Sequence, residues 1–223
     1  MNWFKRITYI LSKKISRQNL DDFIKKNINT KSEKKTLILN IGSGGEIEEF
    51  LKKIPNTKLI SVDINPERNP NIVADISDKN FINKINFTPD YITCFEVLEH
   101  IKNPFEAISN LFEISRKETI LLFSVPFIFP IHEEPNDFYR FTKYGLKYIF
   151  RNFSNVEILN RDGFIDNMFV LSVRLKFSKN YFLKSYALIC IMLYFILFPL
   201  IKLIQFFIKF DKITTGYLIK VKK

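Results

Sequence analysis

The chain has 223 residues, 47% of them hydrophobic, which is enough to bury one sizeable core but not two full domains. Its formal net charge of +11 is uneven: ten Lys and Arg stand against three Asp and Glu in residues 1–35, and ten against one in residues 174–223. Residues 36–173 are net acidic, with fourteen basic and nineteen acidic side chains. A uniform nucleic-acid patch would not leave the middle of the chain acidic, so the basic ends favour an anionic membrane surface. Nucleic acid is the less expected partner for the same charges. Biased codon usage is the alternative explanation of the basic charge.

Two cysteines occur, Cys94 in an expected buried strand and Cys190 in a hydrophobic run. They suggest neither a disulfide framework nor a metal cluster, so we predict no metal site. Residues 1–20 are basic but contain no apolar stretch of signal-peptide length. We therefore expect a cytoplasmic protein, peripheral or monotopic at the inner face of the cell membrane.

The N-terminal segment has amphipathic character. Apolar side chains recur at helical spacing in residues 3–15, at Phe4, Ile7, Leu11 and Ile15. The pattern predicts a helix that is either an interfacial anchor or lid, or an ordinary first helix packed on the domain. Residues 27–35 are polar and lysine-rich, which is typical of a linker.

From Thr36 onward, short apolar runs alternate with longer mixed segments. This alternation predicts an α/β fold with a parallel sheet and helices on both faces. Asn103 and Pro104 form a good helix start, an N-cap followed by a first-turn proline. Strands are expected at 36–41, 58–63, 70–74, 90–95, 119–125, 155–160 and 214–221, and helices at 45–54, 103–115 and 142–151.

The apolar run at residues 37–41 breaks into Gly42, Ser43 and Gly44 before helix-forming residues resume. A buried strand that ends this way lets a ligand lie against bare main chain near the amides of the next helix. Asp63 ends the next strand, where an acidic residue can accept hydrogen bonds from both ribose hydroxyls of a nucleoside. A steric turn and a simple cap are the alternatives, but together the two signals favour a nucleotide-cofactor site.

Four segments carry a resemblance to a known family. They are Leu39–Gly44, Val62–Asp63, Val73–Asp75 and Phe95–Ile101, the last containing Glu-Val-Leu-Glu-His. The series resembles the class I S-adenosylmethionine-dependent methyltransferases, in particular their type 11 branch. A later stretch, His132 to Thr142, is similar to an H-x-x-P-x-D-[FY]-[FY]-R-[FY]-T segment of some bacterial and archaeal members. The resemblance spans residues 36–173 and implies a Rossmann-like class I methyltransferase sheet.

The resemblance also implies the cofactor, S-adenosyl-L-methionine, and the residues that bind it. Gly42 and Gly44 would lie behind its methionine part, Asp63 would hold the ribose and Asp75 would face the adenine amino group. Phe95 and Glu96 would close the pocket after the fourth strand. Two positions depart from the family: Asn40 replaces the usual acidic residue, and Glu46 occupies the third glycine position. Asn40 can still form hydrogen bonds but lacks the charge to pair with the cofactor ammonium group.

Methyl transfer is an in-line displacement, so the protein must mainly align the acceptor and exclude water. The loops after the fourth and fifth strands should face the sulfonium and contain the two histidines, His100 and His132. We expect His132 to act as general base in an acceptor pocket that also includes Asp137 and Tyr139, with Arg140 holding a carboxylate or phosphate. An internal network of His132, Asp137 and Arg140 is the alternative, and for His100 packing or capping is an equal alternative to chemistry.

Residues 187–201 contain no charge, but fifteen positions fall short of the roughly 20 that a membrane-spanning helix needs. If the strand at 214–221 returns to the sheet, a single crossing would leave it on the wrong side of the bilayer. We therefore expect an in-plane or re-entrant hairpin bent at Pro199, with a helical pair in a homodimer interface, or a transmembrane anchor, as the alternatives.

These observations predict four parts. They are a basic amphipathic segment (1–35), a methyltransferase-like core (36–173), a hydrophobic membrane-associated insert (174–212) and the final strand of the core (213–223).

The expected function is methylation of a small or lipid-linked acceptor at the membrane surface. Resemblance to polysaccharide-associated members suggests a sugar or glycolipid hydroxyl, and a quinone-like lipid is another candidate. A short-chain NAD(P) dehydrogenase would use the Tyr139 and Lys143 pair, but Glu46 and Ile47 place charge and bulk where a pyrophosphate would need room. A non-catalytic membrane-peripheral module that retains the fold is the second alternative.

Overall fold

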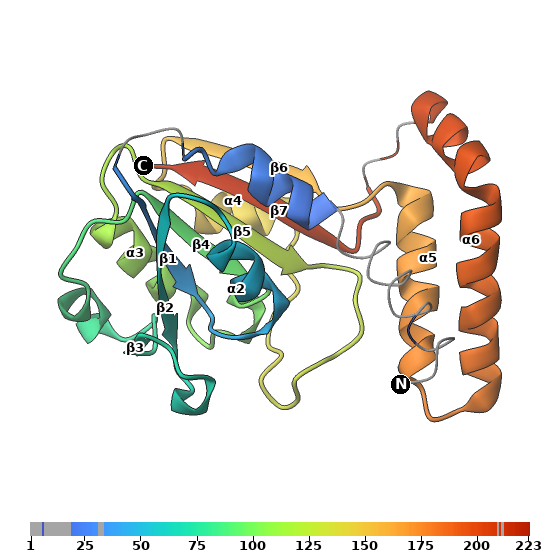
Figure 1. Cartoon of the computed structure of the whole chain (residues 1–223), viewed down its shortest axis with the longest axis horizontal. Coiled ribbons are helices and arrows are strands. Elements are labelled where there is room, and N and C mark those ends of the chain that lie inside the picture. The colour runs from blue at the N-terminus through green and yellow to red at the C-terminus, as the bar shows by residue number, and fades with distance from the viewer. Residues whose placement is uncertain (1–5, 7–18, 31–33, 209, 211) are drawn as a thin grey trace. The chain divides into compact units, whose positions relative to one another are not determined.

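The computed structural model describes residues 6, 19–30, 34–208, 210 and 212–223 (Figure 1). The amphipathic helix predicted for residues 3–15 therefore lies outside the described residues, apart from Arg6.

Residues 19–27 are helical. The strands are β1 (Thr36–Ile41), β2 (Thr57–Asp63), β3 (Ile72–Val73), β4 (Tyr91–Phe95), β5 (Ile120–Pro126), β6 (Asn155–Asn160) and β7 (Gly216–Lys222). The helices are α2 (Gly45–Lys52), α3 (Pro104–Ile114), α4 (Lys143–Ile149), α5 (Phe164–Arg174) and α6 (Tyr181–Phe207), with 3₁₀ turns η1 (Pro66–Arg68), η2 (Lys79–Lys84), η3 (Leu98–His100) and η4 (Leu175–Phe177).

The strands form one seven-stranded sheet in the order β3-β2-β1-β4-β5-β7-β6. β1 pairs in parallel with β2 and β4, β2 with β3, and β4 with β5. β7 runs antiparallel to its neighbours, since the amide of Phe127 donates to Thr215 while the amides of Arg161 and Ser154 donate to Gly216 and Lys222. This topology confirms the expected Rossmann-like methyltransferase sheet.

The strand order reverses beside β1, which lies between β2 and β4. The central strands are hydrophobic on both faces and buried, as β4 and β5 illustrate. Helices cover both faces of a parallel sheet of this kind, with α2 on one face and α3 and α4 on the other (Figure 1). As predicted, α3 begins at Pro104, and the side chain of Asn103 accepts a hydrogen bond from the Glu106 amide at 3.3 Å. Ligands bind such sheets where the strand order reverses, at the carboxyl ends of the strands.

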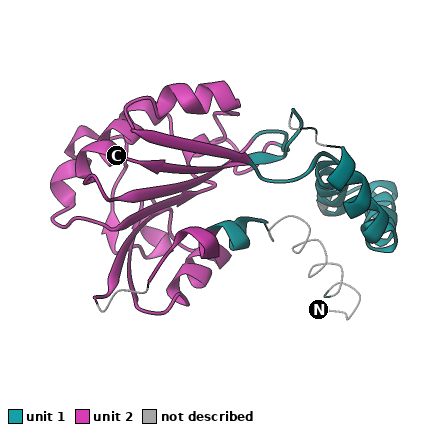
Figure 2. Ribbon diagram, turned by 90° about the horizontal axis from the view of Figure 1, so that it is seen from above, with its two compact units in different colours: residues 1–23, 127–130, 160–216 teal, residues 24–126, 131–159, 217–223 magenta. Residues whose placement is uncertain are grey.

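The chain divides into two compact units, coloured in Figure 2. One comprises residues 24–126, 131–159 and 217–223 and holds nearly all of the sheet, and the other comprises residues 1–23, 127–130 and 160–216. The predicted boundary between residues 173 and 174 falls at the end of α5, which here shares a unit with α6.

In the second unit, α6 is a single helix of 27 residues that packs against α5. It continues through Pro199, so the predicted hairpin bent at this residue is wrong. Proline removes one hydrogen bond and costs a helix interior about 3 kcal/mol. Packing against α5 offsets this cost on both sides of the proline, because Ile191 and Tyr194 before it and Ile201 after it are buried in one cluster with Val170 and Val173.

Candidate active site

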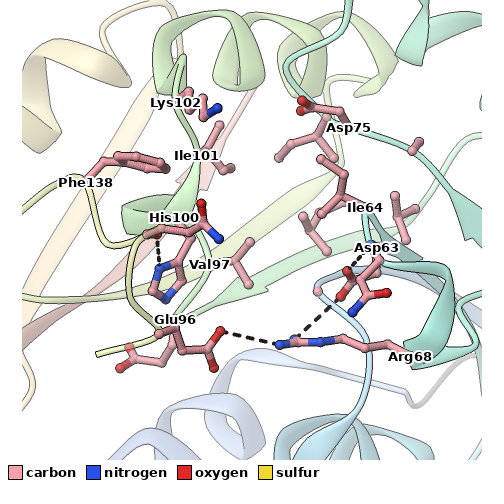
Figure 3. Close-up of a pocket in the computed structure, with 18 residues that line it drawn as sticks. Asp63, Ile64, Arg68, Asp75, Glu96, Val97, His100, Ile101, Lys102 and Phe138 are labelled. Atoms are coloured by element: carbon pink, nitrogen blue, oxygen red, sulfur yellow. Dashed lines mark hydrogen bonds and ion pairs between the residues drawn. The ribbon is translucent and has the colours of Figure 1, made fainter. Parts of the chain in front are cut away.

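A cavity of about 440 Å³ opens at the carboxyl ends of β1, β2 and β4 (Figure 3). Figure 3 shows Asp63, Ile64, Arg68 and Asp75 on one side of it, and Glu96, Val97, His100 and Phe138 on the other. Charged groups of both signs therefore face each other across apolar surface. The remaining wall residues are Ile41, Gly42, Val62, Asn65, Ala74, Ile76, Ile101, Lys102, Glu133 and Asn136.

Gly42 forms the floor of the turn between β1 and α2. Its φ angle is +88°, and a Cβ atom added here would lie 2.6 Å from Cγ2 of Val97. Its amide continues the sheet by donating to the Val62 carbonyl at 2.8 Å. Both the backbone conformation and the space therefore require glycine, which brings main chain directly to the wall of the cavity.

Asp63 at the end of β2 is a well-positioned acceptor. One carboxylate oxygen accepts from the Ser43 amide at 2.7 Å, and the other accepts from the Asn65 amide at 2.8 Å. An ionised carboxylate has about four lone-pair sites, so both oxygens retain capacity for a ligand. The backbone thus fixes Asp63 in one orientation with unused acceptors at the cavity.

The turn is braced from the helix side by the buried Glu48. Its carboxylate accepts hydrogen bonds from the Gly44 amide and, at 3.0 Å, from the Ser43 hydroxyl. Burial raises the pKa of the Glu48 carboxyl, but the hydrogen bonds from Gly44, Lys52 and Ser43 outweigh it and the pKa lies below its usual value. The sequence did not single out Glu48. Its position in the first turn of α2, where a carboxylate can reach back to a preceding amide, is the signal that could have identified it.

Asn40 is held within the protein. Its amide nitrogen donates to the Gly42 carbonyl at 2.5 Å, and its oxygen accepts from the Thr93 hydroxyl at 2.8 Å. The side chain therefore links β1 to β4 and supports the glycine turn. Glu46, at the third glycine position, is exposed on α2 and is not among the residues that line the cavity in the described part of the chain.

Two further acidic residues line the cavity. Asp75 follows β3 and is exposed, with one oxygen accepting from the amide and hydroxyl of Ser77 at 2.8 and 2.7 Å. Glu96 follows β4 with a φ angle of +55°, and its carboxylate accepts from the Ser124 hydroxyl at 2.8 Å. A positive φ is uncommon outside glycine and turns this side chain out of the strand direction, toward the cavity. The preceding Phe95 is buried in β4.

Arg68 is a cavity residue that the sequence did not single out. Its guanidinium lies 3.7 Å from the Asp63 carboxylate and 3.4 Å from that of Glu133 (Figure 3). It thereby connects the end of β2 with the loop that follows β5. The Asn-Pro-Glu-Arg run after Asp63 was the available signal, because Asn65 caps the short η1 turn that carries Arg68.

The loop between β5 and α4 contains the network that was the alternative for His132. Both terminal nitrogens of Arg140 donate to Asp137 at 2.6 Å, and Nδ1 of His132 lies 3.3 Å from Asp137. The Arg140 hydrogen bonds lower the pKa of Asp137 well below its usual range, despite burial of the carboxylate. The Tyr139 hydroxyl donates to the Lys102 carbonyl at 2.9 Å.

The structure therefore brings part of the predicted site together. Gly42, Asp63, Asp75 and Glu96 line one cavity. Within the described residues, the rest of the predicted set supports the cavity wall or lies beside it. These residues are Asn40, Ser43, Gly44, Phe95, His132, Asp137, Tyr139 and Arg140.

The fold and the cavity define an α/β enzyme of the nucleotide-cofactor class. The sequence matches the family described as "Methyltransferase domain" over residues 12–159, and the chain belongs to this family. No curated protein matches the sequence at a significant level.

Solved structures share the fold at low sequence identity. A SAM-dependent methyltransferase from Archaeoglobus fulgidus is 18% identical with a TM-score of 0.58, and the match covers 96% of this chain and 99% of that one. Phosphoethanolamine N-methyltransferase 2 from Haemonchus contortus, solved with S-adenosyl-L-methionine, is 15% identical with a TM-score of 0.54 over 92% and 52% of the two chains. A methyltransferase from Clostridium acetobutylicum ATCC 824 is 14% identical with a TM-score of 0.53 over 99% of both chains.

Family and fold together make this protein an S-adenosylmethionine-dependent methyltransferase. The cavity fits the cofactor, because main chain at Gly42 can lie against it and oriented carboxylates surround it.

Proposed function

We propose that this methyltransferase acts on a hydroxyl group of a small or lipid-linked acceptor at a membrane surface. One observation carries the proposal for the catalytic site. The cavity that holds Gly42, Asp63 and Asp75 is also lined by Glu133 and Phe138 from the loop after β5. Donor and acceptor would therefore meet in one cavity, as an in-line displacement requires.

Each cofactor group would have a partner in this cavity. Asp63 would accept from the ribose hydroxyls, Asp75 from the adenine amino group, and Ile64 would cover the adenine ring. Glu96 would supply the negative charge for the cofactor ammonium, because Asn40 is neutral and its side chain is occupied by Gly42 and Thr93. When bound, the cofactor supplies an electrophilic methyl group on its sulfonium.

The remaining task of the protein is to align the acceptor and receive its proton. As proposed from the sequence, His132 would take the hydroxyl proton, with Asp137 orienting its imidazole from a distance of 3.3 Å. Both terminal nitrogens of Arg140 donate hydrogen bonds to Asp137. Arg140 would therefore act by holding Asp137 in place beside His132. Lys102, which lines the cavity, is the better cation for an anionic group on the acceptor. Tyr139 would fix the loop through its bond to Lys102.

The membrane part of the proposal depends on α6. Within the described residues it is the one helix long and apolar enough to cross a membrane, by length and composition. Only a stripe of its residues faces α5, and apolar side chains on its other faces are exposed, including Met192 at 61% and Ile196 at 69%. Lys184 and Lys202 add positive charge at intervals along it. Such a helix suits the interface of an anionic bilayer.

Chain connectivity favours an in-plane position for α6 over a crossing. The pair α5 and α6 connects β6 to β7, and both strands belong to the same sheet. The chain must therefore enter and leave the pair on one side of a bilayer. α5 has 11 residues and spans about 16 Å, about half the 30 Å hydrocarbon core, so it cannot serve as a return span.

Two experiments test the two parts of the proposal. Calorimetry should detect binding of S-adenosylmethionine and its demethylated product but not NAD or NADP, and transfer of labelled methyl should be sought in membrane lipid and saccharide extracts. Absence of all cofactor binding would instead favour the non-catalytic module.

For the membrane part, Ile196→Lys should reduce co-flotation with anionic vesicles, whereas Tyr144→Lys, which adds the same charge at an exposed position of α4, should not. Equal flotation of both variants would refute membrane contact through α6, and concentration-dependent dimers lost in Ile196→Lys would identify a second copy as its partner.

A further inference from the structure

Three side chains of metal-ligand type converge beside the cavity. Glu99 and His100 lie in η3 after β4, and His132 lies in the loop after β5. One potential ligand atom from each lies within 4.8 Å of the other two. The sequence contains only two histidines, 32 positions apart. The fold brings them together, and the centroids of their rings are 4.9 Å apart.

An acceptor group beside Nδ1 gives each imidazole the orientation of a metal ligand. Nδ1 of His100 lies 2.7 Å from the Asn136 carbonyl oxygen, which can only accept, so Nδ1 carries the hydrogen and Nε2 carries the lone pair. Nδ1 of His132 similarly lies 3.3 Å from the Asp137 carboxylate. Metal-binding histidines are commonly held in this way, with the second ring nitrogen donating to a carbonyl or a carboxylate.

The two Nε2 atoms face the same carboxylate oxygen. Oε1 of Glu99 lies 3.7 Å from Nε2 of His100 and 3.9 Å from Nε2 of His132. These separations are too long for hydrogen bonds. They are close to the roughly 3.4 Å between two atoms that bind one ion tetrahedrally at 2.0–2.2 Å. All three ligand atoms lie within 4.8 Å of one another, so binding one ion would draw the two imidazoles together by up to about 1.4 Å.

The main chain at Glu99 is anchored to the loop after β5. The Glu99 side chain is fully buried, and its backbone carbonyl accepts from the amides of Phe138 at 2.9 Å and Tyr139 at 3.2 Å. These bonds tie the loop that carries His132 to the turn that carries Glu99. Bringing the three side chains together therefore does not require the loop to move.

We propose that Glu99, His100 and His132 bind one divalent transition-metal ion of the zinc type. Two imidazoles and one carboxylate suit such an ion, whereas Mg²⁺ and Ca²⁺ prefer oxygen ligands. Three protein ligands leave coordination positions open, and His100 also lines the cavity.

A role for the ion follows if the acceptor is a hydroxyl, and this part rests on the function proposed above. A hydroxyl at an open position would have a lowered pKa and would lose its proton to solvent as its oxygen bonds to the methyl carbon and the carbon–sulfur bond breaks. With the ion bound, the metal would replace His132 as the group that activates the hydroxyl, because coordination occupies the Nε2 lone pair that a general base needs.

The test is a metal titration of the full chain after chelation and dialysis, in the absence of acceptor. Zn²⁺ and Co²⁺ should bind one ion per chain, and bound Co²⁺ should show visible absorption without a thiolate band. His100→Ala and His132→Ala should each weaken Zn²⁺ binding at least 100-fold. Asp137→Asn, which alters a positioning residue, should weaken it about 10- to 100-fold. Glu134→Gln, an exposed carboxylate of the same loop, should have no effect.

Three results would overturn the site: no Zn²⁺ or Co²⁺ binding to the wild type, equal binding by the double histidine variant, or Mg²⁺ binding as tight as that of Zn²⁺. S-adenosylmethionine binding is measured on the same wild-type sample. Its absence would refute the proposed function but not the metal site.

Discussion

Replacement of Asp63 by Asn tests the assignment of the cofactor site most directly. The substitution keeps the shape of the side chain and removes its charge. The two carboxylate oxygens are oriented by the amides of Ser43 at 2.7 Å and Asn65 at 2.8 Å. In either orientation, the new amide nitrogen would face one of these N–H donors. The variant therefore loses both the charge and one of the two contacts that position the side chain.

A hydrogen bond to a charged acceptor contributes about 1.5–3 kcal/mol, so loss of one such bond to the ribose should weaken binding about 10- to 150-fold. Calorimetric titration with S-adenosylhomocysteine measures this change, and thermal denaturation separates it from loss of folding. The matched control is Asp78→Asn, because exposed Asp78 accepts a similar bond from the Asn80 amide at 2.8 Å but is not part of the described cavity wall. An Asp63→Asn variant that folds normally and binds within twofold of wild type would remove Asp63 from the site.

Three further predictions concern stability. Gly42→Ala should lower the unfolding free energy by about 1–3 kcal/mol through its positive φ, with a further loss from the clash with Val97. Urea denaturation should show that adding Val97→Ala to the Gly42→Ala variant recovers only the stability lost through the clash. The Tyr194 hydroxyl donates a hydrogen bond of 2.9 Å to the buried carboxylate of Asp166 in α5. Tyr194→Phe removes this donor and should lower the unfolding free energy by about 1–3 kcal/mol in the same assay. An unchanged midpoint would show that the bond contributes nothing. The hydrogen bonds from Arg140 lower the pKa of Asp137, so its stabilising contribution is present above pH 4 and is lost as the pH falls further. Asp137→Asn should therefore destabilise the protein at pH 7 and differ less from wild type at pH 3; a constant difference would refute this linkage.

Local patterns determined much of the fold in advance. The alternation of apolar runs with mixed segments predicted the parallel strands, because strands buried on both faces must be nearly continuously hydrophobic. Asn103 and Pro104 predicted the start of α3 for an equally local reason. Gly42 and Asp63 were identifiable as cavity residues because each directly follows or ends a strand, and the carboxyl ends of adjacent parallel strands share one edge.

Only the tertiary structure decided how distant side chains combine. Pro199 predicts a break when the helix is considered alone, but packing of Ile191, Tyr194 and Ile201 against α5 holds α6 continuous. The cavity position of Arg68 and the convergence of His100 with His132 likewise depend on contacts between separate loops. The sequence by itself determined the strands of the sheet, the helices that follow β1, β4 and β5, and the edge of the sheet that carries the site, since these follow from periodicity and turn chemistry. The long-range partners of charged side chains, such as Arg68 with Glu133 and Glu99 with His132, were decided by the folded chain, because the packing of elements far apart in sequence brings them together.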